Sequence, residues 1–333
     1  MDVQPHVITR RREFLNEKRM LSLLIFVLML SLTSAVVAAQ TITIGWSQYT
    51  QKSPFYTELI RAAKLEAENN NVRLIVLDAM DDIVKQTADV EDLIARGVDV
   101  LVVNPKDPKA ILVAVEQANR AGIPVIVADS GIDASAKVAA QIRANNFEIG
   151  FLTGEHIAKT VGAETNMVII SGTIESIAGM ERRNGMIAGF YDYALKTYGK
   201  ADLNVLVEGW GAWTKQGGVE AMEPILVAHK DIDVVFAVND SMALGALQAI
   251  EEAGREGEIL VAAIDGEKQA YDLIKEGRYL ASGLNNPTIL GQETIKLALQ
   301  VFNGEDVDPI QYTPVDVVTK GNVDKYYDPA SEF

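Results

Sequence analysis

The sequence has no cysteine at any of its 333 positions. Disulfides and thiolate metal sites are therefore excluded, a composition compatible with the bacterial periplasm even though disulfides can form there. Histidine is scarce as well, and neither His156 nor His229 has a second histidine at metal-binding spacing. We expect both histidines to be structural, and we expect neither a metal nor a cofactor.

The sequence also lacks the motifs of common enzymes. It contains no Walker-type phosphate loop, no G-x-G-x-x-G after the first apolar run and no G-x-S-x-G nucleophile elbow. Two carboxylates at a suitable separation could still perform glycosidase chemistry. We therefore predict that the protein is not an enzyme, with a secreted carbohydrate-active enzyme as the alternative.

Positive charge is in short supply, because the formal net charge is −16. Nucleic acid binding depends on a basic footprint on the protein surface, so we expect no nucleic acid partner. The balance is typical of a soluble acidic protein and indicates nothing about a specific ligand.

A long charge-free run occurs near the beginning, where LSLLIFVLMLSLTSAVVAA follows the basic segment RREFLNEKRM. The run ends in the small residues Ala38 and Ala39, which predicts a signal peptide over residues 1–39, cleaved before Gln40, and a periplasmic protein. A membrane anchor is the alternative, since about 20 apolar residues can span a bilayer. The stretch from Arg11 to Leu15 resembles a twin-arginine export box, so the export route stays open.

From Thr41 onward, short apolar runs such as VRLIVLD alternate with amphipathic stretches such as FYTELIRAAKLEAENN. Continuous apolar strands separated by helices predict parallel sheets that are covered on both faces. The fold class is therefore doubly wound α/β. The chain also exceeds the usual single core of about 250 to 300 residues, which favours two lobes.

An internal similarity supports two lobes. Segments 101–131 and 235–267 share one order: strand, Asn, helix, strand, Asp. Asn104 precedes Asp129 by 25 residues, and Asn239 precedes Asp265 by 26. The two halves therefore look like copies of one architecture.

Polar residues end the apolar runs in both halves, namely Asp129, Asn239, Asp240 and Asp265. The carboxyl ends of parallel strands border the crevice where ligands bind, so two facing lobes would gather these side chains around one cleft. Each could instead cap the following helix, because Asn and Asp are favoured N-caps. Asp240 is the residue for which we expect capping alone.

Acids and amides at such a cleft suit a neutral ligand that is rich in hydroxyl groups, because a hydroxyl both donates and accepts hydrogen bonds. Aromatic faces would cover the apolar C–H side of a sugar. The candidates are Phe55, Tyr56 and Trp213, and for Trp210 the sequence leaves a surface role equally open.

Six segments together resemble the ribose-binding protein group of periplasmic sugar-binding proteins, which is related to the ligand-binding part of LacI-type repressors. They are SPFYTELIRAAKLEA, NPKDPKAI, AGIPVIVADS, GMERRNGM, FAVNDSMALGAL and AAIDGE. The similarity runs from Thr41 to Thr319. It implies two similar doubly wound parallel-sheet lobes joined by a three-segment hinge, the type I periplasmic binding protein arrangement. The implied lobes are 40–144 plus 286–314 and 145–285 plus 315–333, with crossings near Ala144, Asn285 and Pro314.

The resemblance also implies ligand contacts. In the first lobe these are Ser47, Ser53, Phe55, Tyr56 and Asp129, and in the second lobe and hinge they are Arg182, Trp213, Asn239, Asp265 and Asn285. Arg182 has an alternative as a solvated charge, since it is flanked by Glu181 and Arg183.

The chain departs from the ribose binders at several positions. Ser130 stands where they carry Arg, and Asn285 stands where they carry Gln. The segment SQYTQKSPF is longer, which brings Gln48, Tyr49 and Lys52 within reach of a ligand. A hydroxyl cannot replace the bidentate bonds of a guanidinium, so we expect a ligand other than ribose: another pentose, a hexose or an open-chain polyol.

The resemblance implies the periplasmic solute-binding component of an ABC importer, whose lobes close on the ligand before the protein docks on the permease subunits. Presentation of the ligand to a chemoreceptor is compatible with that role, and the family suggests a monomer. An effector-sensing regulator of the LacI type is a further alternative. It would need a basic helix-turn-helix where this chain has the apolar run.

Overall fold

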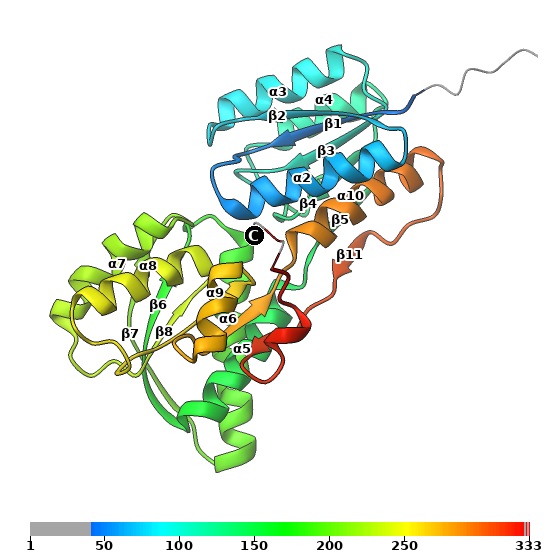
Figure 1. Cartoon of the computed structure of the whole chain (residues 1–333). Coiled ribbons are helices and arrows are strands. Elements are labelled where there is room, and N and C mark those ends of the chain that lie inside the picture. Colours follow the sequence, from blue (N-terminus) through cyan, green and yellow to red (C-terminus); the bar gives the residue numbers. More distant parts are fainter. Residues whose placement is uncertain (1–40, 330, 332) are drawn as a thin grey trace, which may run out of the picture. The chain divides into compact units, whose positions relative to one another are not determined.

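The computed structural model describes residues 41–329, 331 and 333. The signal peptide predicted over residues 1–39 and its cleavage site lie outside the described residues. Residues Ile42–Phe333 form one compact unit, which consists of two α/β lobes (Figure 1). Within this described part, no helix is long and apolar enough to cross a membrane.

The first lobe contains a six-stranded sheet in the order β11-β5-β4-β3-β1-β2, and every neighbouring pair is parallel. Its strands are β1 (Thr43–Gln48), β2 (Arg73–Asp78), β3 (Val100–Asn104), β4 (Val125–Ala128), β5 (Ala140–Ala144) and β11 (Ile310–Thr313). The central strands β3 and β4 are buried at every residue. This burial explains why they read as continuous apolar runs in the sequence.

Helices cover both faces of this sheet. They are α2 (Pro54–Asn69), α3 (Ile83–Ala95), α4 (Leu112–Arg120) and α10 (Pro287–Phe302). Alternate residues of a strand point to opposite faces. Val100 and Val102 accordingly pack with α2 and α10, whereas Leu101 and Val103 pack with α3 and α4. The Ser53 side chain caps α2 by accepting from the backbone N–H of Tyr56.

The second lobe repeats the plan with the strand order β12-β10-β9-β8-β6-β7. Its strands are β6 (Glu164–Ser171), β7 (Asp202–Trp210), β8 (Val234–Ala237), β9 (Leu260–Asp265), β10 (Ala281–Leu284) and β12 (Val317–Thr319). Its helices are α5 (Asn146–Val161), α6 (Ile177–Tyr198), α7 (Lys215–Ala228), α8 (Asp240–Glu252), α9 (Lys268–Glu276) and the 3₁₀ turn η1 (Val323–Lys325). The edge strand β12 runs antiparallel to β10, a feature that the alternating sequence pattern did not predict.

Helices α5 and α6 approach closely because glycines face each other across their contact. A Cβ added to Gly150 would lie 2.2 Å from the carbonyl oxygen of Arg182, and one added to Gly154 would lie 2.0 Å from that of Met186. Gly185 and Gly189 contact α5 in the same way. The glycines thereby fix the distance between α5 and the turn of α6 that carries Arg182.

The chain passes between the two sheets three times. It leaves β5 at Ala144 and enters α5 at Asn146, leaves β10 at Leu284 and enters α10 at Pro287, and runs from β11 to β12 between residues 313 and 317. We propose on this basis that the lobes comprise 40–144 plus 286–314 and 145–285 plus 315–333.

Candidate functional site

A cavity of about 290 Å³ lies where both lobes contribute side chains. It borders the carboxyl ends of strands in both sheets, where open parallel sheets bind their ligands. It is lined by most of the predicted contact residues, namely Tyr49, Ser53, Phe55, Tyr56, Asp129, Ser130, Arg182, Trp213, Asn239, Asp265 and Asn285. Lys52 lines the cavity as well.

Three residues named from the sequence are not brought to the cavity. Ser47 is fully buried inside the central strand β1, between Leu77 of β2 and Val103 of β3. Gln48 is also buried, and its amide donates to the Thr50 carbonyl. Trp210 is 44% exposed at the end of β7 and does not line the cavity. Ser47 and Gln48 belong to the buried strand β1, so their side chains do not reach the cavity that the following residues Tyr49 and Lys52 line.

On the side of the first lobe, hydroxyl groups lead to Asp129. The Tyr49 hydroxyl donates to the Tyr56 hydroxyl at 2.9 Å, and the Tyr56 hydroxyl donates to Oδ2 of Asp129 at 3.1 Å. The two tyrosine rings meet edge to face at 5.1 Å. Burial raises the pKa of Asp129, and the Arg182 guanidinium opposes this shift. Tyr56 therefore occupies one carboxylate oxygen of Asp129.

On the side of the second lobe, Arg182 is buried and held by protein groups. Its Nη1 lies 2.9 Å from Oδ1 of Asp265 and donates to the Val238 carbonyl at 2.8 Å. Its Nε donates to Oδ1 of Asn146 at 2.8 Å. The guanidinium carbon also lies 5.9 Å from the ring centroid of Trp213.

The alternative that Arg182 is a solvated charge is wrong, since only 4% of the residue is exposed. Its neighbours behave differently. Glu181 pairs with Arg143 of β5 at 2.7 Å, and Arg183 pairs with Glu208 of β7 at 2.7 Å. The helix thus turns Arg182 inward and the flanking charges toward other partners.

Asp265 ends β9 with a φ of 129°, which L-residues rarely adopt. Its Oδ1 accepts from Nδ2 of Asn285 at 3.1 Å. Burial raises the pKa of Asp265 to about 7, against the opposing effect of Arg182 and with a further contribution from Asp240. The Asn285 oxygen is buried and finds no hydrogen-bond partner among the residues that the structure describes. A ligand hydroxyl could donate to it.

Trp213 and Asn239 hold each other. The amide nitrogen of Asn239 donates to the Trp213 carbonyl at 3.3 Å. The Trp213 ring covers Gly172, where an added Cβ would lie 2.0 Å from Cε2, so the indole depends on that glycine. Asn239 also caps α8, because its side-chain oxygen accepts from the Met242 N–H at 3.0 Å. Capping and cavity lining are therefore combined in one residue.

Asp240 does not cap α8, contrary to the sequence-based expectation. It is fully buried at the first position of the helix, and Asn239 takes the cap. Its carboxylate accepts from the hydroxyls of Tyr279 and Ser282 and from the backbone N–H groups of Gly266 and Glu267. These partners lie far away in sequence, so the local pattern could not reveal them.

Sequence reasoning missed other residues around the site. Asn146, at the start of α5, orients Arg182. Asp81, Lys106, Thr173 and Ser176 line the cavity. The asparagine directly after the first crossing was a usable signal for Asn146, whereas the loop residues follow no strand-end pattern.

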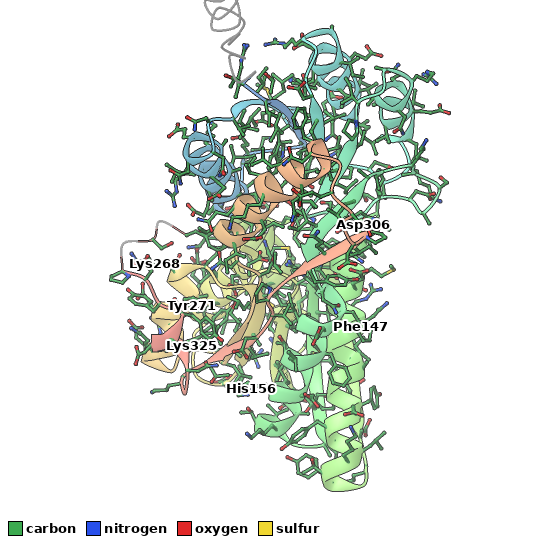
Figure 2. All side chains as sticks on the ribbon, turned by 90° about the vertical axis from the view of Figure 1, so that its right-hand side faces the viewer. Phe147, His156, Lys268, Tyr271, Asp306 and Lys325 are labelled. Atoms are coloured by element: carbon green, nitrogen blue, oxygen red, sulfur yellow. The ribbon has the colours of Figure 1, made fainter. Side chains whose placement is uncertain are left out.

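The remaining histidine of interest, His156, lies on α5 and does not line the cavity (Figure 2). Burial lowers its pKa, and the nearby Lys159 lowers it further. The searched, described residues contain no group of three or more His, Cys, Asp or Glu that could hold a metal ion.

Two α/β lobes around one cavity, joined by three crossings, define a class of ligand-binding proteins that hold their ligand between the lobes. The model of the periplasmic binding protein domain family matches residues 44–306. The chain belongs to this family.

Curated relatives are similar over most of the chain. A ribose import binding protein of Bacillus subtilis is 34% identical over 278 residues, which are 84% of this chain and 87% of the relative. A xylitol-binding protein of Mycolicibacterium smegmatis is 30% identical over 289 residues, 86% of this chain and 79% of the relative.

Solved structures share the fold. An ABC transporter solute-binding protein from Mycobacterium smegmatis with bound glycerol has a TM-score of 0.80 and 34% identity, covering 87% of this chain and 98% of that one. A solute-binding protein from Bacillus halodurans with bound myo-inositol has a TM-score of 0.78 and 32% identity, covering 86% and 97%. A third, from Actinobacillus succinogenes with bound D-allose, has a TM-score of 0.79 at 27% identity and covers 86% and 100%.

Proposed function

We propose that the protein is the periplasmic solute-binding component of an ABC importer and that it holds a monosaccharide or a related polyol between its two lobes. This proposal rests mainly on one observation: Asp129 from one lobe lines the same cavity as Asp265, Arg182 and Asn285. The relatives are import binding proteins, so binding rather than catalysis or gene regulation is the activity that we assign.

The groups of the cavity match the chemistry of a hydroxyl-rich ligand. The oxygen of Asn285, without a partner among the described residues, needs a donor. The Asp129 carboxylate has hydrogen bonds with Tyr56, Asn104 and Ser130, and a carboxylate can accept about four. Hydrogen bonds to charged groups contribute about 1.5 to 3 kcal/mol each. The half-buried Trp213 ring offers an apolar face for the C–H side of a sugar. A volume of about 290 Å³ lies at the lower end of ligand pockets, which start near 300 Å³, and suits a single small carbohydrate.

We expect ribose to make fewer hydrogen bonds in this cavity than it makes in the ribose-binding proteins. Ser130 supplies a hydroxyl where a guanidinium would donate two parallel bonds. The Tyr49 and Tyr56 hydroxyls occupy part of the polar surface of the first lobe. Relatives and structural neighbours bind ribose, xylitol, glycerol, myo-inositol or D-allose, so the family accommodates both sugars and polyols. Because Ser130 replaces the guanidinium, we expect a polyol or a sugar other than ribose.

Binding would favour a closed arrangement of the lobes. Contacts that are divided between the lobes are complete only when the lobes approach, and this difference in affinity shifts the population toward the closed form. The three crossings would absorb the rotation. The closed protein would then dock on the permease subunits. Closure is also compatible with presentation of the ligand to a chemoreceptor. The predicted signal peptide would direct export and would then be cleaved near Ala39.

A thermal-shift experiment tests this proposal. We would add D-ribose, D-allose, myo-inositol, xylitol and glycerol separately to the purified protein. A compound that binds only the folded state stabilises it, by about 2.7 kcal/mol at a concentration of 100 times its Kd, and so raises the melting temperature. We expect at least one compound to do so in the wild type and to lose its effect in Asp129→Ala and Asp265→Ala.

The matched control is Asp92→Ala, which removes an exposed carboxylate of α3. It should keep the full shift. The proposal is wrong if none of these compounds, nor any in a wider set of carbohydrates, raises the melting temperature. It is also wrong if the shift survives in both cavity variants, or if incubation converts the compound into a product.

A further inference from the structure

The buried carboxylate of Asp240 lies directly behind the candidate site. It is fully buried and does not line the cavity. Its Oδ1 accepts from the Tyr279 hydroxyl at 2.7 Å. Its Oδ2 accepts from the Ser282 hydroxyl at 2.7 Å and from the backbone N–H groups of Gly266 and Glu267 at 2.7 and 2.9 Å. The last two residues directly follow Asp265 in the chain.

The turn formed by Gly266 and Glu267 has little freedom. Gly266 has a φ of 92°, and an added Cβ there would lie 2.3 Å from the Tyr271 hydroxyl. Tyr271 belongs to α9, and Figure 2 shows it close to Lys268, the first residue of that helix. The Gly266 N–H is shared between Asp240 and the Ser282 hydroxyl, at 2.7 and 3.1 Å. Two anchored N–H groups thus fix the backbone immediately after Asp265.

Asp265 needs such an anchor because its backbone is strained. A residue in a sparsely populated φ region costs about 1 to 3 kcal/mol and persists only where the surroundings hold it. The side chain of Asp265 makes its contacts to Arg182 at 2.9 Å and to Asn285 at 3.1 Å from this conformation. A relaxed backbone would turn the carboxylate away from both.

We propose that Asp240 is a positioning residue that holds the Gly266–Glu267 turn and so keeps the Asp265 carboxylate against Arg182 and Asn285 in the cavity. Its geometric part concerns the unliganded protein. The consequence for affinity rests on the proposed function, because it assumes that Asp265 contacts the ligand.

Oδ2 is the oxygen that holds the turn, because it accepts from both backbone N–H groups and from the Ser282 hydroxyl, whereas Oδ1 accepts only from the Tyr279 hydroxyl. A backbone N–H can only donate, so both amides need an acceptor at the Oδ2 position, whereas a tyrosine hydroxyl can donate or accept. An asparagine could keep its oxygen on the turn and direct its N–H₂ group to Tyr279. Alanine removes the acceptor altogether, which makes it the sharper probe.

Charged groups face Asp265 from several elements: Arg182 of α6, Asp240 of α8 and Asp129 of the first lobe. The Glu267 carboxyl accepts from the Ser241 hydroxyl, and its pKa is raised to about 8 by burial and then by Asp240. Burial raises the pKa of Asp240 as well, and its hydrogen bonds from Tyr279, Ser282 and the two backbone N–H groups oppose that shift.

Amide hydrogen exchange by NMR on the unliganded protein tests the proposal without any ligand. We expect the Gly266 and Glu267 amides of Asp240→Ala to exchange at least tenfold faster, relative to interior amides of α8, than those of the wild type. The Asp265 carboxyl ¹³C resonance, assigned with Asp265→Asn, should shift as its contacts are lost. Asp240→Leu has the branched shape of the aspartate side chain but no acceptor, so it should give the same acceleration if Asp240→Ala does not fold.

Two controls separate positioning from general destabilisation. Ile250→Val trims a fully buried side chain of the same helix and should leave the exchange ratio and the Asp265 resonance unchanged. Tyr279→Phe removes the bond to Oδ1 alone and should leave both amides protected. Unchanged relative exchange in Asp240→Ala, or in Asp240→Leu where Asp240→Ala does not fold, would overturn the proposal. An equal acceleration in Ile250→Val would do the same.

Because these measurements need no added compound, they stand apart from the thermal-shift test. Failure of every carbohydrate to bind would remove the functional consequence and leave the geometric result intact. Normal exchange in Asp240→Ala would remove the positioning role while the binding function could still hold.

Discussion

Asp129 directly follows β4 and Asp265 ends β9, and both have a positive φ, at 64° and 129°. Such conformations are unfavourable for residues other than glycine, and their presence at one cavity is a sign of function. Asp265 is buried and Asp129 is half-buried, and removal from water raises the pKa of each carboxyl. Each of the two acids therefore has an unfavourable backbone conformation and a carboxylate that is destabilised by loss of water.

That cost has a measurable pH dependence. Burial raises the pKa of Asp265 to about 7 and of Glu267 to about 8, above the ordinary values of 3.8 and 4.5. The folded protein therefore binds more protons than the unfolded chain between these limits. The stability from these groups is complete below pH about 4 and is lost as the pH rises through about 7 to 8, with a slope of up to about 1.4 kcal/mol per pH unit per group.

We predict that Glu267→Gln loses less stability than the wild type between pH 5 and pH 8. Urea unfolding at several pH values measures this difference, and glutamine keeps the shape of the side chain. The exposed Glu305→Gln serves as the matched control and should follow the wild-type curve. A Glu267→Gln curve parallel to that of the wild type would contradict the raised pKa.

The sequence was informative for residues whose signal is local. Asp129, Asn239 and Asp265 follow apolar runs, and that position alone places them at the edge of a parallel sheet. Asp240 obeys the same pattern and yet points inward, because its partners are distant in the chain: Tyr279 precedes β10, and Ser282 lies within it. Contacts of this range have no local signature.

At the scale of elements, the helix pair α5 and α6 delivers Arg182 to the cavity. Four glycines allow backbone contact between the helices, and Gly150 faces the carbonyl of Arg182 itself. An alanine there would sit 2.2 Å from that oxygen, too close to be accommodated without moving a helix.

We predict that Gly150→Ala destabilises the protein by about 1 to 3 kcal/mol, as overpacking does. It should also weaken binding of the strongest compound of the thermal-shift panel at least tenfold, because α6 carries Arg182 outward. Urea unfolding and isothermal titration calorimetry measure the two effects.

Ile157→Val is the control for this prediction, since it trims a fully buried side chain of α5 without pressing on α6. It should lower stability by about 0.5 to 1.5 kcal/mol and leave the affinity unchanged. If Gly150→Ala bound as tightly as Ile157→Val, the link between helix spacing and the site would be wrong.

Element types were readable from the sequence, but some pairings were not. The alternation of apolar runs and amphipathic stretches gives the parallel strands and their helices. The antiparallel strand β12 was not predicted. Its three residues pair with β10 only because the third crossing brings them to that edge of the sheet. Similarly, Phe333 packs edge to face on Phe55 at 5.7 Å, a contact between distant parts of the chain.

At the scale of the whole molecule, the two lobes divide the work. The first supplies Asp129 with its tyrosine hydroxyls, and the second supplies Arg182, Asp265 and the indole of Trp213. Arg143 of β5 and Glu181 of α6 form an ion pair between the lobes beside the first crossing. Neither lobe alone holds a full set of partners for a polyol, and this division is what would make closure depend on the ligand.

A crystal structure with the strongest compound of the panel tests the central claim most directly. The account predicts one molecule in the cavity, with hydroxyl groups within hydrogen-bond distance of Asp129, Asp265 and the Asn285 oxygen at the same time. A compound bound to one lobe alone, or outside the cavity, would contradict it.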